Sequence, residues 1–232
     1  MTKVPIDYDT GPKEGREGEF LTILFDLDGT LIDSTEAILE SFHNSYDVHG
    51  RGHPEDEAIK SLIGHPLDEM YRRMGIEEAM VWTFVDTYKE HYRKISTQKT
   101  VLLEHAREAI SEASRFARLG VVTTKTGKYS RELLEHFGVM HHFEVLIGRE
   151  DVEHPKPHPE PIEKAVAMMA CEKGSCWMIG DTRLDIEAAK NASIGYVAVS
   201  SGYDTREQLL TIAENVEKNA LEAVRYIAGV AE

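Results

Sequence analysis

Two aspartates near the start of the chain, Asp26 and Asp28, have the type and spacing that could hold a metal or act on phosphorus. They follow the apolar run Phe20 to Phe25, which predicts a buried strand with Asp26 at its end and Asp28 on the same side. Carboxylates this close repel each other unless a cation lies between them or they share a proton. A carboxylate can also attack phosphorus to form an aspartyl-phosphate while a neighbouring carboxyl group moves the proton.

Three further polar clusters contain residues that would complete such a site. They are Thr123-Thr124-Lys125, then Lys156 within a proline-rich stretch, and the acidic pair Asp181 and Asp185. Carboxylates with few neutral ligands suit a hard cation, and Mg²⁺ typically keeps waters and a substrate phosphate in its shell. A lysine together with the metal can stabilise the charge on transferring phosphoryl oxygens.

The elements that must position these clusters alternate between strands and helices. Strands are expected at 119–123, 143–147, 175–179 and 196–200, and helices at 103–118, 128–137, 159–170, 183–191, 204–214 and 217–228. This alternation predicts an α/β fold with a parallel sheet covered on both faces. In a doubly wound sheet the clusters would meet Asp26 at the carboxyl edge of the strands, where such sheets bind ligands.

The stretch between the first strand and the alternating part predicts a separate helical insert. A helix is expected from about Ser34 to His49, begun by a capping box at Asp33–Glu36, and helical segments follow with breaks at Gly64–Pro66 and Gly75. No strand is expected between Ile32 and about Leu119. We therefore expect a loosely held tail (1–19), a core (20–33 and 100–232) and a helical cap domain (34–99).

Composition limits the classes of partner. The formal charge is −15 and no basic stripe offsets it, which argues against nucleic acid or an anionic membrane as a partner. Cys171 and Cys176 are too few for a disulfide framework and match no zinc spacing, so a reduced, cytoplasmic protein is expected. No secretory signal and no apolar run long enough to span a membrane is present in this sequence.

Each candidate also has an ordinary structural interpretation. A single Asp-x-Asp after a strand is more often a solvated turn, and Lys156 between prolines could be an exposed loop residue. Asp185 lies three residues after Thr182 and could simply cap a helix. These interpretations do not explain why all four clusters fall at predicted strand ends.

Taken together, the motifs resemble those of the haloacid dehalogenase-like hydrolase superfamily, and most closely its phosphoglycolate phosphatase-like branch. The motifs are Asp26-Leu-Asp28-Gly-Thr, Val-Val-Thr123-Thr-Lys, Lys156-Pro-His-Pro and Gly-Asp181-x-x-x-Asp185, in that order between about residues 20 and 200. The resemblance implies a Rossmann-like core with strand order 5-4-1-2-3 and a helical cap inserted after the first motif. It also implies a Mg²⁺-dependent phosphatase acting on a small phosphorylated metabolite.

The resemblance further implies a role for each motif residue. Asp26 is expected to be the nucleophile and Asp28 the general acid/base, whose backbone carbonyl also binds Mg²⁺. Thr123, Thr124 and Lys156 are expected to bind the phosphoryl group. Asp181 is expected to bind the metal, with Asp185 supporting it directly or through water.

The chain departs from the family pattern in two places. Thr124 stands where many members have Asn, so any contact made by that amide is in doubt. The segment Thr100–His105 lacks the common Pro-Gly turn, so the end of the cap domain is not sharply defined.

The break at Gly64-His65-Pro66 resembles the family loop that selects substrate, which makes His65 and Arg72 candidate substrate contacts. A surface histidine and a solvated arginine are their ordinary interpretations.

Several functions compatible with these motifs stay open. Phosphoglycolate is the first expected substrate; a pyrophosphatase and a β-phosphoglucomutase-like phosphoryl transferase are alternatives within the superfamily. A metal-free dehalogenase would not need Asp28. A phospho-accepting signalling domain also uses an acidic cluster and a lysine, but it leaves the helical insert unexplained. An inactive, binding-only member is disfavoured because all the expected catalytic residues are present. The sequence does not indicate the oligomeric state.

Overall fold

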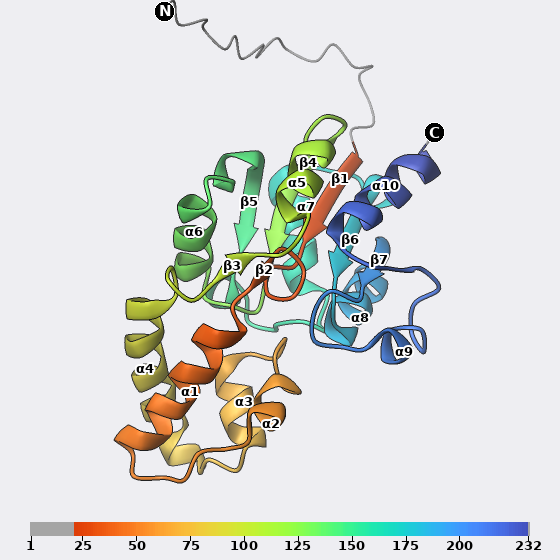
Figure 1. Ribbon diagram of the computed structural model, residues 1–232. Coiled ribbons are helices and arrows are strands. Elements are labelled where there is room, and N and C mark those ends of the chain that lie inside the picture. The colour runs from red at the N-terminus through yellow and green to blue at the C-terminus, as the bar shows by residue number, and fades with distance from the viewer. Residues whose placement is uncertain (1–20, 232) are drawn as a thin grey trace, which may run out of the picture.

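A six-stranded parallel sheet forms the centre of the computed structural model, which describes residues 21–231 (Figure 1). Its strands are β1 (Leu21–Phe25), β4 (Ala117–Val122), β5 (Phe143–Ile147), β6 (Cys176–Gly180), β7 (Gly195–Val199) and β8 (Val216–Glu217). They lie in the order β5-β4-β1-β6-β7-β8, and each neighbouring pair is parallel. Counted in chain order, the five long strands β1, β4, β5, β6 and β7 are strands 1 to 5. Read from β7 to β5 they lie in the expected order 5-4-1-2-3, so the predicted Rossmann-like fold is confirmed.

The edge strand β8 was not expected, because a strand of two residues shows no periodicity in the sequence. It lies in the region where two long helices were predicted. The structure has instead the short α9 (Arg206–Leu209), then β8, and then α10 (Ala220–Ala231). The predicted helix at 204–214 is therefore wrong over most of its length, whereas the final helix is present.

Helices cover both faces of the sheet because the side chains of the central strand alternate between them. Ile23 and Phe25 pack in one apolar cluster with residues of α5, α6 and α10, while Leu24 packs in another with residues of α7 and α8. The remaining core helices are α5 (Ala106–Ala113), α6 (Gly127–His136), α7 (Glu160–Met169) and α8 (Arg183–Ala192), with 3₁₀ turns η1 (Met140–His142), η2 (Arg149–Asp151) and η3 (Lys173–Ser175). No helix in residues 21–231 is both long and apolar enough to cross a membrane.

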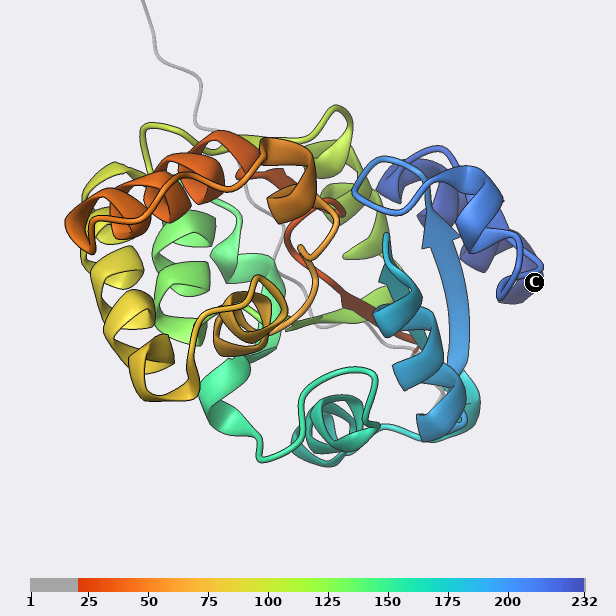
Figure 2. The same ribbon diagram turned by 90° about the horizontal axis from the view of Figure 1, so that it is seen from below.

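Four helices at the carboxyl ends of the strands have a core of their own (Figures 1 and 2). They are α1 (Thr35–Val48), α2 (Asp56–Lys60), α3 (Leu67–Arg73) and α4 (Glu78–Ile95). Phe42 is central to this core, with its ring 4.7 Å from that of Tyr71 and 5.2 Å from that of Tyr88. We call these four helices and their connections the cap, and we propose 34–99 as its limits.

The chain enters and leaves the cap through two short strands that pair with each other. β2 (Ile32–Asp33) and β3 (Val101–Leu102) are antiparallel. The expectation of no strand between Ile32 and about Leu119 is therefore wrong, because two-residue strands again leave no pattern, and because β4 begins at Ala117. The predicted tail at 1–19 lies outside the described residues.

Candidate active site

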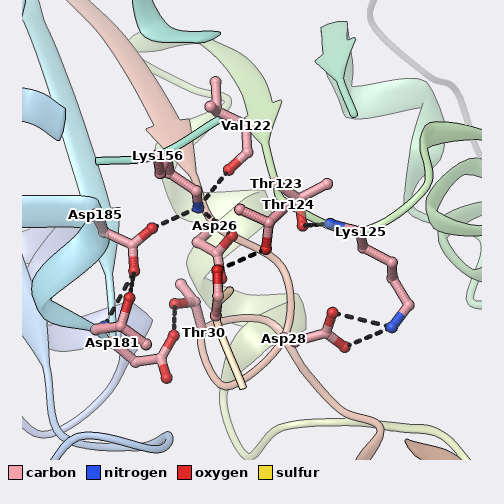
Figure 3. A network of polar contacts seen from close by, with 12 residues as sticks. Asp26, Asp28, Thr30, Val122, Thr123, Thr124, Lys125, Lys156, Asp181 and Asp185 are labelled. Atoms are coloured by element: carbon pink, nitrogen blue, oxygen red, sulfur yellow. Dashed lines mark hydrogen bonds and ion pairs between the residues drawn. The ribbon is translucent and has the colours of Figure 1, made fainter. Parts of the chain in front are cut away.

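The buried side chain of Lys156 connects three segments that are far apart in the sequence. Its ammonium group donates hydrogen bonds to the Asp26 carboxylate at 2.6 Å, to the Asp185 carboxylate at 2.5 Å and to the Val122 carbonyl at 3.1 Å (Figure 3). Burial alone would lower the pKa of Lys156, but the carboxylates of Asp185 and Asp26 raise it by more. The lysine is therefore held charged against the end of β1.

Asp181 is the third buried acid at this edge of the sheet. It accepts hydrogen bonds from the Thr30 hydroxyl and from the backbone N–H of Tyr203, both at 2.9 Å. Two glycines make room for it: a Cβ on Gly29 or Gly202 would lie 2.2 or 1.9 Å from an oxygen of Asp181. Gly29 also has a φ of +86°, which L side chains rarely adopt. The turn after β1 is therefore shaped around this carboxylate.

Asp26, Asp181 and Asp185 together form a candidate metal site. Each presents a carboxylate oxygen within 4.8 Å of the others, and all three are buried. If all three were ionised, their charges would exceed the single positive charge of Lys156 by two. Burial, together with the charges of Asp26 and Asp185, raises the pKa of Asp181 well above its usual range. Burial also raises the pKa of Asp26 to about 7, with Asp185 and Asp28 adding to the rise and Lys156 opposing it.

This excess of buried negative charge fits a divalent cation. The donors are all carboxylate oxygens, which suit a hard cation such as Mg²⁺ rather than a metal that prefers sulfur or imidazole ligands. Asp26, Asp181 and Asp185 would hold the ion.

Asp185 combines the two interpretations that the sequence left as alternatives. One of its oxygens accepts from Lys156, and the other accepts from the backbone N–H and the hydroxyl of Thr182 at 3.0 and 2.7 Å. The contact with the backbone N–H belongs to a capping box at the start of α8. The helix start and the site thus share one side chain.

The Asp28 carboxylate is turned away from this acidic cluster (Figure 3). It pairs with the ammonium of Lys125 at 3.0 Å and accepts a short hydrogen bond from the Ser34 hydroxyl. The expectation from strand alternation is therefore wrong for Asp28, since β1 ends at Phe25 and the chain turns at Gly29. The predicted metal contact through the backbone carbonyl of Asp28 stays a prediction.

The Ser34 contact also corrects the expected start of α1. The Ser34 hydroxyl makes no cap of the helix and donates to Asp28 instead. The backbone N–H of Thr35 donates to Asp33 at 2.9 Å. The predicted capping box is therefore formed only in part, because Asp33 accepts from the helix start while the Glu36 carboxylate accepts from the ammonium of Lys99 at 2.7 Å instead.

Lys125 is a residue that we identified in its motif without giving it a role. Besides pairing with Asp28, its ammonium lies 4.6 Å from the centre of the Tyr92 ring, which belongs to α4 of the cap. Burial would lower its pKa, but Asp28 and then Tyr92 raise it by more. The only signal in the sequence was its position directly after two hydroxyl residues at a strand end.

The other predicted residues are placed as follows. The Thr123 hydroxyl accepts from the backbone N–H of Lys125 at 3.2 Å, and the Thr124 hydroxyl donates to the carbonyl of Gly64 in the cap at 2.8 Å. Phosphoryl contacts by these two hydroxyl groups stay predictions. The Thr124 contact shows instead that this side chain joins the core to the cap loop.

The two candidate substrate contacts of the cap lie in different surroundings. His65 lines a cavity under the cap, and burial, followed by the charge of Arg73, lowers its pKa. It is therefore mostly neutral near pH 7. Arg72 instead pairs with Asp68 at 2.6 Å and with Glu78 at 2.7 Å, and it is not among the residues that line the cavity.

Comparison with known proteins gives consistent similarities. Residues 23–199 match the family model described as haloacid dehalogenase-like hydrolase. Pyrophosphatase PpaX of Halalkalibacterium halodurans is 33% identical over 189 residues, which cover 81% of this chain and 86% of that protein. Pyrophosphatase PpaX of Bacillus velezensis is 33% identical over 209 residues, covering 90% and 96%.

Two solved structures share the fold. A predicted phosphatase from Clostridium acetobutylicum has a TM-score of 0.82 at 24% identity, covering 91% of this chain and all of that one. A predicted phosphoglycolate phosphatase from Haemophilus somnus has a TM-score of 0.79 at 21% identity, covering 90% and 99%.

Replacing Lys156 by methionine should destabilise the protein strongly. The change removes the ammonium group from two buried carboxylates, a loss that typically costs about 3–5 kcal/mol. Urea unfolding at pH 7, followed by circular dichroism, would measure this loss against Lys218→Met, which removes an exposed lysine. Equal unfolding free energies for the two variants would contradict the assigned interaction.

Proposed function

Because the chain belongs to the haloacid dehalogenase-like hydrolase family, we propose that it is a Mg²⁺-dependent phosphatase that hydrolyses a small phosphate monoester through an aspartyl-phosphate at Asp26. The observation that supports this most is the buried contact between Asp26 and Lys156 within a cluster that also includes Asp181 and Asp185. It combines a carboxylate nucleophile, a fixed positive charge and a hard-cation site at one edge of the sheet.

In the first step, an oxygen of Asp26 attacks phosphorus and the bond to the leaving oxygen breaks. Asp28, in its protonated form, gives its proton to that oxygen. In the second step, Asp28 takes a proton from water as the water attacks the aspartyl-phosphate, which releases phosphate and restores Asp26. The Lys125 ammonium, 3.0 Å away, holds the Asp28 side chain in one position for both steps.

The charges around Asp26 serve the phosphoryl group. Lys156 holds the attacking carboxylate in place, and its fixed ammonium is suited to stabilise the oxygens of the transferring group. Mg²⁺, held by Asp26 and Asp181 with support from Asp185, would neutralise further charge on those oxygens. Thr123 and Thr124 remain candidate phosphoryl contacts.

The residues assigned so far act on the phosphoryl group and do not define the leaving group. Family resemblance makes 2-phosphoglycolate the first substrate to test, and the names of the curated relatives make pyrophosphate the second. Phosphate release without a sugar acceptor would separate hydrolysis from β-phosphoglucomutase-like transfer. A long-lived aspartyl-phosphate would instead support a signalling domain. We place the protein in the cytoplasm, where Cys171 and Cys176 would stay reduced.

Metal removal should abolish turnover. With EDTA the site would lose the cation that neutralises the oxygens of the transferring group, so phosphate release should stop and return on addition of Mg²⁺. Ca²⁺ should restore little activity, because it favours a larger and looser ligand shell. Phosphate release from p-nitrophenyl phosphate is the measurement, and full activity in EDTA would rule out the metal role.

Asp26 and Asp28 should fail at different steps. Asp28→Asn should still release the good leaving group p-nitrophenol in a stoichiometric burst, and then turn over roughly 10²–10⁴-fold more slowly than the unmodified enzyme. Asp26→Asn should give neither burst nor turnover, because an amide cannot form the acyl-phosphate. Exposed Asp33→Asn is the matched control and should keep normal kinetics. A burst from Asp26→Asn would refute its role as nucleophile.

A further inference from the structure

A cavity of about 380 Å³ lies between the cap and the core, next to the candidate active site. Its core side includes Asp28, Thr124 and Lys125, and its cap side includes residues of α3 and α4. Asp26 does not line it. Asp28 is thus the acidic residue that belongs both to the proposed catalytic pair and to the cavity.

If the proposed function holds, the position of Asp28 indicates which part of the substrate the cavity binds. Asp28 gives its proton to the leaving oxygen, so the leaving group must lie on the side of the phosphoryl group that Asp28 faces. The Asp28 carboxylate faces Lys125, which also lines the cavity. The leaving group would therefore occupy the cavity, while the phosphoryl group stays at Asp26 and Lys156.

The lining of the cavity is more apolar than polar, and much of it is aromatic. Its apolar and aromatic side chains include Met70, Trp82, Val85, Tyr88, Tyr92 and Tyr129. Trp82, Val85, Tyr88 and Tyr92 recur at helical spacing along one face of α4. The rings of Tyr88 and Tyr92 are stacked 5.5 Å apart, and the Tyr129 ring of α6 lies 6.1 Å from that of Tyr92. Such a wall favours an apolar or ring-bearing group.

Most of the charged groups at the cavity already have partners. Lys125 pairs with Asp28, Asp68 pairs with Arg72 at 2.6 Å, and Glu150 accepts from the backbone N–H of Gly127 at 2.8 Å. His65 is mostly neutral near pH 7 and adds no charge for a carboxylate.

Two cations, Lys89 and Arg149, also reach the lining and have no carboxylate partner within residues 21–231. They allow the leaving group to carry an acidic substituent. They do not account for the apolar and aromatic side chains that form most of the wall.

We propose that this cavity binds an apolar leaving group of about the size of a phenyl ring or a hexyl chain. The preferred substrates would then be phosphate monoesters of hydrophobic alcohols rather than phosphoglycolate or pyrophosphate. The leaving groups of those two compounds are anions of five non-hydrogen atoms. They would lose hydration against the apolar side chains of the wall.

The chain length of simple esters tests this proposal. Ethyl, butyl and hexyl phosphate have leaving groups of similar acidity, so differences in kcat/KM report binding in the cavity. Each step of two methylenes should raise kcat/KM about tenfold, and 2-phenylethyl phosphate should match the hexyl ester. Phosphoglycolate and pyrophosphate should fall below both. A flat series, or a preference for either anion, would overturn the proposal.

A variant at the cavity wall provides the second test. Trp82 is 55% exposed, so Trp82→Ala should fold normally while removing part of the wall. It should lower kcat/KM for hexyl and 2-phenylethyl phosphate by about three- to tenfold and leave ethyl phosphate unchanged. Val48→Ala, which truncates a cap residue that is 61% exposed and lies outside the cavity lining, is the control. An equal loss for all three esters would refute the specificity role.

The same assays separate failure of this inference from failure of the proposed function. Mg²⁺-dependent release of p-nitrophenol without any effect of chain length would refute the inference alone. No phosphate release from any ester or from pyrophosphate would refute the phosphatase proposal on which it rests.

Discussion

The contact between the Lys156 ammonium and the carboxylates of Asp26 and Asp185 is the interaction on which the rest of the site depends. It brings together the end of β1, the loop before α7 and the start of α8 through three buried side chains. A buried charge is tolerated only when it is paired and hydrogen-bonded, so each of these segments constrains the other two. Because Asp181 adds a third carboxylate and no second lysine joins the described cluster, the arrangement stays negative and suits a divalent cation.

The cap is connected to this site through side chains that follow β4. Thr124 donates to the Gly64 carbonyl of the cap, and Lys125 lies between Asp28 and the ring of Tyr92. Two consecutive residues therefore join the cap loop and α4 to the core. The groups that we propose to act on phosphorus lie in the core, whereas most of the apolar wall beside them belongs to the cap. Under the proposed function, reaction type and substrate choice are consequently assigned to different parts of the chain.

Much of this arrangement could be predicted from the sequence. The apolar runs of β1, β4, β5, β6 and β7 are long enough to show a pattern, and their polar ends identified the residues that converge. Strands of two residues are too short to repeat a pattern, which explains why β2, β3 and β8 could not be predicted. The sequence also could not show which of two partners a side chain binds. Ser34 is a residue type that often caps helices, but its hydroxyl donates to Asp28 because the fold places that carboxylate beside it. The role of Lys125 also depends on a tertiary contact.

The nucleophile is the central claim, and chemical trapping of the covalent intermediate tests it most directly. Borohydride reduces an acyl-phosphate on aspartate to homoserine, which peptide mass analysis can locate. We predict that protein quenched during turnover and then reduced carries homoserine at position 26 and at no other aspartate. Homoserine at Asp28, Asp181 or Asp185, or none in protein that is turning over substrate, would contradict the account.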